Sequence, residues 1–200
     1  MKKLVVATRN PHKVRELSEL LAGEGVELVS LADFPGAPAV AETGEDFREN
    51  AVSKALAAAR HTGLTALADD SGLEVDALDG APGVRSARFA GPEATDAANN
   101  RKLLELLAGV PREGRRARFR CVLALADPDG TVETVEGRCE GRIAEAPRGQ
   151  GGFGYDPLFE EPQTGLTFAE MDSRTKHRYS HRARAAEALK PLLRARWRDG

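Results

Sequence analysis

Short apolar runs that alternate with amphipathic segments constrain the fold of this chain more than any other feature. A short continuous apolar run is typical of a buried strand, whereas apolar residues every three or four positions indicate a helix. The alternation predicts an α/β protein. The expected elements of the first third are a strand at 3–8, a helix at 10–23, a strand at 26–31, a helix with Phe47, Ala51, Ala55 and Ala58 at helical spacing, and a strand at 64–68.

Start and stop signals support the two helices. Asn10 is the expected N-cap of the first, with Pro11 at its first position and Gly23 at its end. Thr43 and Asp46, three residues apart, predict a capping box for the second. The third strand is expected to end at the acidic pair that follows it.

The rest of the chain predicts a loop, a helix, a long hairpin, a second loop and a final helix. Residues 76–94 are rich in Gly and Pro and are interpreted as an ordered loop, after which Thr95 or Asp96 caps a helix. Alternating apolar residues on both sides of the DPDG turn predict a β-hairpin over 116–144. A Gly-rich loop at 147–159 precedes a final helix that Ser180 caps and that runs to about Trp197, with an expected kink at Pro191.

This order of elements favours a mixed sheet over a doubly wound parallel one. We expect a single domain over 1–200, and two lobes with a cleft, because the polar motifs lie far apart in the sequence.

Composition narrows the function classes. The net charge of −2 argues against bulk binding of nucleic acid or a membrane surface, and no apolar run reaches the roughly 18 residues of a membrane span. The N-terminal segment turns polar after five residues, so no leader is expected. Cys121 and Cys139 are expected to be buried thiols. No zinc-site spacing occurs, so any metal is expected to be a hard cation held by carboxylates.

Asp69 and Asp70 are the strongest chemical signal, because two adjacent carboxylates after an apolar run are costly without a cation nearby. Followed by Ser71 and Gly72, they suit a Mg²⁺ ligand beside a close backbone approach. A turn in which one aspartate caps local N–H groups is the alternative.

Three further segments suit a nucleotide. Residues 8–13 run from a strand into a helix start that attracts anions, and Lys13 stands there against the helix dipole. Phe153 and Tyr155 lie between glycines, where an aromatic ring can stack on a flat ligand. Residues 176–184 concentrate basic side chains. Each segment has an ordinary structural reading, namely a solvated helix start, a packed turn and a solvated basic face. Together they predict sites for a base, a polyphosphate and a metal.

Five ordered motifs, TRNPHK, FRENAVSKA, ADDSGLEVDALDGAPGVRSARFAG, GGFGYDPLF and SHRARA, resemble those of the inosine/xanthosine triphosphate pyrophosphatase family over residues 4–195. The resemblance implies an elongated two-lobed α/β structure with a mixed sheet, flanking helices and a central substrate cleft. It also implies Mg²⁺-dependent hydrolysis of dITP, ITP or XTP to the monophosphate and pyrophosphate, in a cytoplasmic homodimer.

By the same resemblance, Asp70 is the catalytic residue that activates water and ligates the metal. Relatives commonly carry two acids before the TG pair, whereas this chain has Ala41 and then Glu42, which is expected to substitute weakly as a metal ligand. Asp69 is expected to orient its neighbour. The residues expected to bind substrate are Thr8, Arg9, Asn10, Pro11, His12, Lys13, Lys54, Ser71, Phe153, Gly154, Tyr155, Asp156, Lys176, His181 and Arg182.

Two alternatives stay open at this point. One is a pyrophosphatase for other modified nucleotides. The other is a non-catalytic RNA-binding protein that uses the basic cluster at 176–184, which the acidic net charge disfavours.

Overall fold

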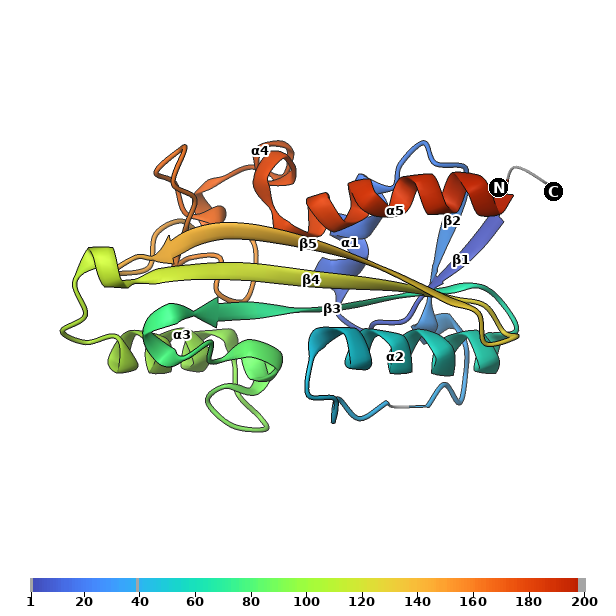
Figure 1. The fold of residues 1–200 in the computed structure, drawn as a ribbon, viewed down its shortest axis with the longest axis horizontal. Helices are drawn as coiled ribbons and strands as arrows, with labels where there is room; N and C mark the ends of the chain where they lie inside the picture. The colour runs from blue at the N-terminus through green and yellow to red at the C-terminus, as the bar shows by residue number, and fades with distance from the viewer. Residues whose placement is uncertain (1, 39, 198–200) are drawn as a thin grey trace. The chain divides into compact units, whose positions relative to one another are not determined.

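A computed structural model describes residues 2–38 and 40–197. Six strands form one sheet in the order β2-β1-β3-β4-β5-β6 (Figure 1). The strand β1 pairs in parallel with β2 and β3, and β5 pairs antiparallel with β6. The predicted α/β class with a mixed sheet is therefore confirmed. The elements are β1 (Lys2–Val6), α1 (Pro11–Leu20), β2 (Val26–Ser30), α2 (Phe47–Thr62), β3 (Ala66–Val75), α3 (Asp96–Leu106), β4 (Arg116–Ala126), β5 (Val132–Ile143), β6 (Phe159–Glu160), α4 (Ser173–Tyr179) and α5 (His181–Trp197).

The chain divides into two compact units. Unit 1 comprises the described parts of 1–70, 121–137 and 182–200, and unit 2 comprises 71–120 and 138–181. Three of the boundaries fall inside β3, β4 and β5, so each of these strands contributes residues to both units, and the fourth lies directly after His181, the first residue of α5. The expected cleft between two lobes stays a prediction.

Helices cover both faces of the sheet in unit 1. On one face, the apolar sides of α1 and α5 pack with Leu4, Val6 and Leu67 in a single buried cluster. On the other face lies α2 (Figure 1), whose small side chains Ala51 and Ala55 are buried completely. Small residues allow a helix to approach a sheet closely.

Unit 2 has a core of its own, centred on aromatic rings. Phe119 of β4 lies 4.6 Å from Phe159 and 5.9 Å from Phe168, measured between ring centroids. Leu73 of β3 and Leu103 of α3 are buried in the same cluster. Tyr155 of the GGFGYDP motif is buried in this cluster as well.

The local signals were right for the start of the first helix, which ends at Leu20 and not at Gly23, and wrong for the start of the second. The side chain of Asn10 accepts hydrogen bonds from the N–H groups of His12 and Lys13, and Pro11 opens α1 as predicted. The N-cap of α2 is Asp46, not Thr43, because the Asp46 carboxylate accepts from the N–H of Glu49 at 2.8 Å. The predicted capping box was therefore placed one turn too early.

Two other elements differ from the prediction. The strand β3 does not end at the acidic pair but continues to Val75, because the apolar residues after the pair are buried as well. The helix α4 was not predicted, while α5 begins directly after Ser180 as expected. Pro191 lies inside α5.

Cys121 and Cys139 are free and buried, as predicted. None of the helices in the described ranges is long and apolar enough to cross a membrane.

Candidate active site

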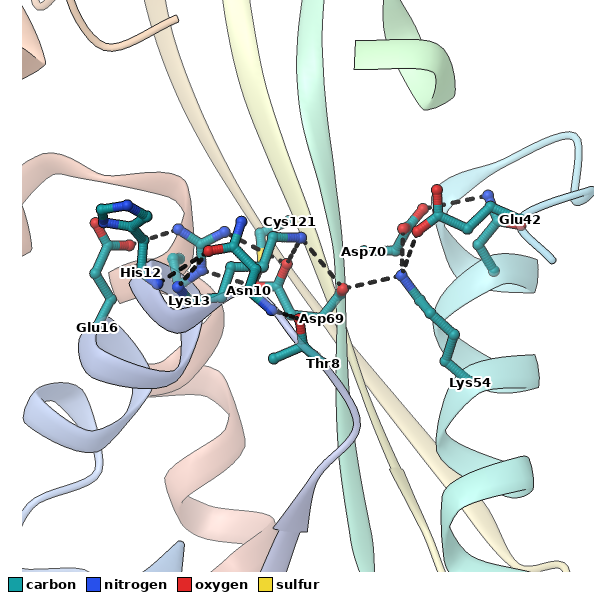
Figure 2. Close-up of polar contacts among 12 residues, drawn as sticks. Thr8, Asn10, His12, Lys13, Glu16, Glu42, Lys54, Asp69, Asp70 and Cys121 are labelled. Carbon is teal, nitrogen blue, oxygen red and sulfur yellow. Dashed lines mark hydrogen bonds and ion pairs between the residues drawn. The ribbon is translucent and has the colours of Figure 1, made fainter. Parts of the chain in front are cut away.

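The strand β3 directs its two acidic side chains to opposite faces. Side chains alternate along a strand, so Asp69 shares a face with Leu67, which packs with α1 and α5. Asp70 shares the opposite face with Ala68. Figure 2 shows this division, with the Asp69 carboxylate among the residues of α1 and Asp70 beside Lys54 of α2. The two carboxylates are therefore neutralised separately.

Two cations and a thiol hold the Asp69 carboxylate. The ammonium of Lys13 lies 2.6 Å from Oδ1, and Nε of Arg182 donates to Oδ2 at 2.7 Å. The thiol of Cys121 donates to Oδ2 at 3.3 Å, and burial raises its pKa well above the usual value. Burial alone raises the pKa of Asp69, but Arg182 and Lys13 outweigh it and hold that pKa well below its usual range. Asp69 is therefore ionised throughout the physiological range.

The ion pair with Asp69 explains why a lysine stands in the first turn of α1. A cation in the first turn opposes the helix dipole, and the chain's own carboxylate offsets that cost. The solvated-lysine reading is excluded, since the side chain of Lys13 is only 15% exposed.

Arg182 is the most enclosed cation of the site, with a side chain 1% exposed. Its Nη1 donates to Oε2 of Glu16 at 2.5 Å, while Nε and Nη2 both donate to Asp69. Burial lowers its pKa, but the two carboxylates raise it above the ordinary value. All three guanidinium nitrogens therefore contact carboxylates of the chain itself.

On the other face of β3, Lys54 joins two carboxylates. Its Nζ lies 2.6 Å from Oδ1 of Asp70 and 3.0 Å from Oε1 of Glu42. Asn50, one helical turn before Lys54, donates to Oδ2 of Asp70 at 3.3 Å. Burial raises the pKa of Asp70, and the charges of Lys54 and Lys13 do not fully offset this desolvation, to which the charge of Glu42 adds. Burial lowers the pKa of Lys54, but Asp70 and Glu42 together raise it.

The two lysines meet at one backbone atom. The carbonyl oxygen of Asp69 accepts from Lys54 Nζ at 3.1 Å and from Lys13 Nζ at 3.4 Å (Figure 2). Asp69 therefore does support the neighbourhood of Asp70, but it does so by holding two lysines and not by touching the Asp70 side chain. Two partly exposed ammonium groups beside one another suit a polyanion.

Side chains of the turn before α1 accept the N–H groups at the start of this helix. The hydroxyl of Thr8 accepts from the N–H of Asn10 at 3.1 Å, which shapes the turn before the helix. Arg9 is exposed and donates to the carbonyl of Ala37 at 3.4 Å, and His12 is exposed at the helix start.

The carboxylates of Asp70 and Glu42 are the candidate metal ligands of this site. Both offer hard oxygen atoms to the same ammonium group, so they lie close enough to share a cation. Within the described residues, no group of three or more His, Cys, Asp or Glu side chains is gathered as a metal cage. Mg²⁺ is commonly bound by one or two carboxylates together with substrate phosphates and water, so the donor set fits this ion.

Unit 2 holds the Gly-rich loop in a fixed conformation. The ammonium of Lys176 lies 2.6 Å from Oδ2 of Asp156, and both side chains are buried. The same oxygen accepts from the N–H of Phe153 at 3.0 Å, and Lys176 lies 5.1 Å from the centroid of the Phe153 ring. The hydroxyl of Tyr155 donates to the carbonyl of Ser86 at 2.7 Å. Its pKa is raised by burial and by the nearby charge of Asp96.

His181 and Ser71 are the other two predicted site residues that belong to unit 2. His181 stacks on Phe119 with ring centroids 4.6 Å apart, and Ser71 follows Asp70 on β3, where it is half-buried.

The structure thus gathers the predicted residues into two groups, one in each unit. Lys13, Lys54, Asp70, Arg182 and Glu42 surround the middle of β3 in unit 1, where the sequence analysis expected cations. The loop residues 153–156 and Lys176 form the group in unit 2.

Several residues of these two groups were not predicted from the sequence. Asn50 stands four residues before Lys54 in the FRENAVSKA motif, and that helical spacing was a usable signal. Glu16 and Cys121 gave no such signal, because each resembles an ordinary residue of its element. Asp96 and Asn100 belong to the α3 segment, which was interpreted only as a helix.

The fold and this arrangement of charges define an α/β protein suited to a polyanion and a hard cation. The chain belongs to the Ham1 family, whose pattern matches residues 4–192. A dITP/XTP pyrophosphatase of Desulforamulus reducens is 57% identical over 191 residues, which are 96% of this chain and 95% of that protein.

Solved structures agree with this assignment. A HAM1 protein from Coxiella burnetii matches with a TM-score of 0.88 and 44% identity, over 98% of this chain and all of the other. A nucleoside-triphosphatase, dITP/XTP pyrophosphatase, from Mycobacterium abscessus matches with a TM-score of 0.76 and 50% identity, over 94% of this chain and 99% of the other.

Proposed function

We propose that this chain is a Mg²⁺-dependent pyrophosphatase of deaminated purine nucleotides that uses Asp70 as its catalytic residue. It hydrolyses dITP, ITP and XTP to the monophosphate and pyrophosphate. Membership of the Ham1 family and the names of the relatives support this activity. The observation that carries the mechanism is the position of Asp70, whose carboxylate is held by Lys54 and Asn50. Lys54 in turn shares the carbonyl oxygen of Asp69 with Lys13.

The triphosphate lies at the lysine pair and at the start of α1. Lys13 and Lys54 supply the charge that a polyphosphate needs, and the positive end of the α1 dipole favours an anion beside them. Both ammonium groups are already fixed by the Asp69 carbonyl, so they need little reorganisation on binding. Arg182 and Lys13 both pair with the Asp69 carboxylate, so Arg182 helps to fix the carboxylate that holds Lys13.

Asp70 accepts the proton from the water that attacks the α-phosphorus. The bond between that phosphorus and the α–β bridging oxygen breaks, and pyrophosphate leaves. Lys54 orients the carboxylate on one oxygen and Asn50 on the other. Asp70 and Glu42 are the residues that would hold Mg²⁺, which neutralises charge on the phosphate oxygens and orients the nucleophile when bound.

The base lies at the loop of residues 153–156 in unit 2, and Lys176 and His181 complete this part of the site. Phe153 offers its ring for stacking, and donors of the loop recognise the six-position oxygen of a deaminated purine. Adenine carries an amino group there and leaves such donors unpaired, at a cost of about 1–3 kcal/mol for each group.

The protein works as a homodimer in the cytoplasm, where the nucleotide precursor pool is found.

The decisive experiment follows the products of ITP hydrolysis by the purified protein in the presence of MgCl₂. We expect IMP and pyrophosphate. Asp70→Asn, which keeps the shape of the side chain, is expected to lower kcat by at least about a thousandfold while the protein stays folded. IDP and free phosphate as products, or near-normal turnover by Asp70→Asn, would contradict the proposal.

The same assay addresses the two alternatives. A preference for dUTP or dTTP over dITP would indicate a pyrophosphatase for other nucleotides. A salt-sensitive shift of RNA in a gel, without turnover of any nucleotide, would indicate an RNA-binding protein.

A further inference from the structure

Two side chains of α3 hold both backbone groups of Gly154, in the middle of the Gly-rich loop. The carboxylate of Asp96 accepts from the N–H of Gly154 at 2.7 Å, and Nδ2 of Asn100 donates to its carbonyl at 2.9 Å. The two residues stand four apart, so they project from the same face of the helix. All of these contacts lie within unit 2.

Gly154 is a position where such fixation has an effect. Its φ of +59° lies in the left-handed region, and a Cβ built there meets no atom within 4 Å. The side of Gly154 on which a side chain would stand is therefore open, and glycine readily adopts other backbone conformations. The hydrogen bonds from α3 hold both of its backbone polar groups in the observed conformation.

The rest of the loop is fixed independently. The carboxylate of Asp156 accepts from the N–H of Phe153 and pairs with Lys176, while Tyr155 is anchored through its hydroxyl to Ser86. The residues on both sides of Gly154 are therefore secured by other elements, and α3 secures the segment between them.

We propose that Asp96 and Asn100 are positioning residues for base recognition, a pair we call the α3 clamp. This inference rests on the proposal that residues 153–156 bind the base. A preorganised loop presents its backbone and the Phe153 ring at fixed positions, whereas a loose loop must be ordered when the nucleotide binds. The clamp thus contributes to affinity and to the preference for hypoxanthine over adenine, and not to the chemical step.

The clamp is tested with Asp96→Ala and Asn100→Leu, each of which removes one hydrogen bond to Gly154. We expect KM for ITP to rise about five- to tenfold in each variant, with kcat within about twofold, because uniform binding is lost. The Kd of IMP should rise by a similar factor, and the ratio of kcat/KM for ITP to that for ATP should fall. Asp96→Asn retains an oxygen acceptor and should restore most of the KM.

Arg101→Ala is the matched control, since Arg101 lies on the same helix with a side chain 73% exposed. It should leave KM, kcat and the ITP preference unchanged. Thermal unfolding of all variants separates loss of fold from loss of recognition. Parental KM and ITP preference in folded Asp96→Ala and Asn100→Leu would overturn the clamp.

Phe153→Ala separates this inference from the proposal it rests on. If Phe153→Ala raises KM for ITP while the α3 variants do not, the base site stands and only the clamp is wrong. If none of the three changes KM or the ITP preference, the assignment of the base to this loop is wrong, and the clamp falls with it.

Discussion

Asp69 is the residue on which the charge balance of unit 1 depends most. Its side chain has no exposure to solvent, yet it is ionised, because Lys13 and Arg182 both contact it. A buried charge without a partner is costly, so each of the three depends on the others. Asp70, its neighbour, has a single lysine that is shared with Glu42 and is correspondingly less stabilised.

Replacing Asp69 by asparagine should therefore be strongly destabilising. The substitution leaves the buried Arg182 and the partly exposed Lys13 facing a neutral amide, and we expect the free energy of unfolding to fall by about 3 kcal/mol in urea denaturation. Asp76→Asn is the comparison, because Asp76 also pairs with an arginine but its side chain is 44% exposed. That change should cost under about 1 kcal/mol. Equal losses in the two variants would refute the account of Asp69.

At the scale of elements, the short strand β6 depends on a glycine in its partner. A Cβ at Gly141 of β5 would lie 2.5 Å from Cζ of Phe159 and 2.6 Å from the carbonyl oxygen of Glu160. Arg142 and Ile143, the next two residues of β5, pair with this strand. Only glycine therefore allows the Phe159 ring to lie directly against the backbone of β5.

Gly141→Ala should weaken this pairing and shift the Phe159 ring. We expect a loss of about 2 kcal/mol in the free energy of unfolding, since overpacking at a backbone contact is relieved only by movement of the strand. Arg138→Ala, on the same strand with a side chain 61% exposed, should change stability by less than about 0.5 kcal/mol. A neutral Gly141→Ala would show that β6 moves away at little cost.

The end of β3 and the N-cap of α2 are two features that local sequence patterns did not predict correctly. The acidic pair predicts the end of a strand, because charged residues in a buried strand are unfavourable unless cations lie on both faces. Those cations come from α1, α2 and α5, and no local pattern reveals them. The cap of α2 was misplaced for a different reason, since Thr43 and Asp46 both suit an N-cap and only the observed bond to Glu49 distinguishes them.

For the whole molecule, the division into two units raises the question of whether they unfold together. Three strands, β3, β4 and β5, contribute residues to both units. Each unit also has a buried free cysteine, Cys121 in unit 1 and Cys139 in unit 2. The two thiols are therefore natural reporters of the two cores.

We expect one cooperative transition. Loss of either unit would cut the shared strands in the middle and leave their remaining halves short, with backbone groups unpaired. Thiol labelling in urea would be measured for Cys121 in Cys139→Ser and for Cys139 in Cys121→Ser. Each midpoint is referred to that of its own variant by circular dichroism. Both thiols should be unreactive in the native state and should react at that global midpoint. A thiol that reacts well before the circular dichroism changes would show that its unit opens alone.

The sequence by itself determined the α/β class, the cap of α1 by Asn10, the hairpin of β4 and β5, and the identity of the family. Each depends on neighbours in the chain or on motifs that can be read in order. The tertiary structure alone decided what surrounds the acidic pair. The partners of Asp69 stand 56 and 113 residues away in the sequence, so only packing of α1 and α5 on the sheet brings them to one carboxylate. Charges that are separated this far are matched by the folded chain and not by any local pattern.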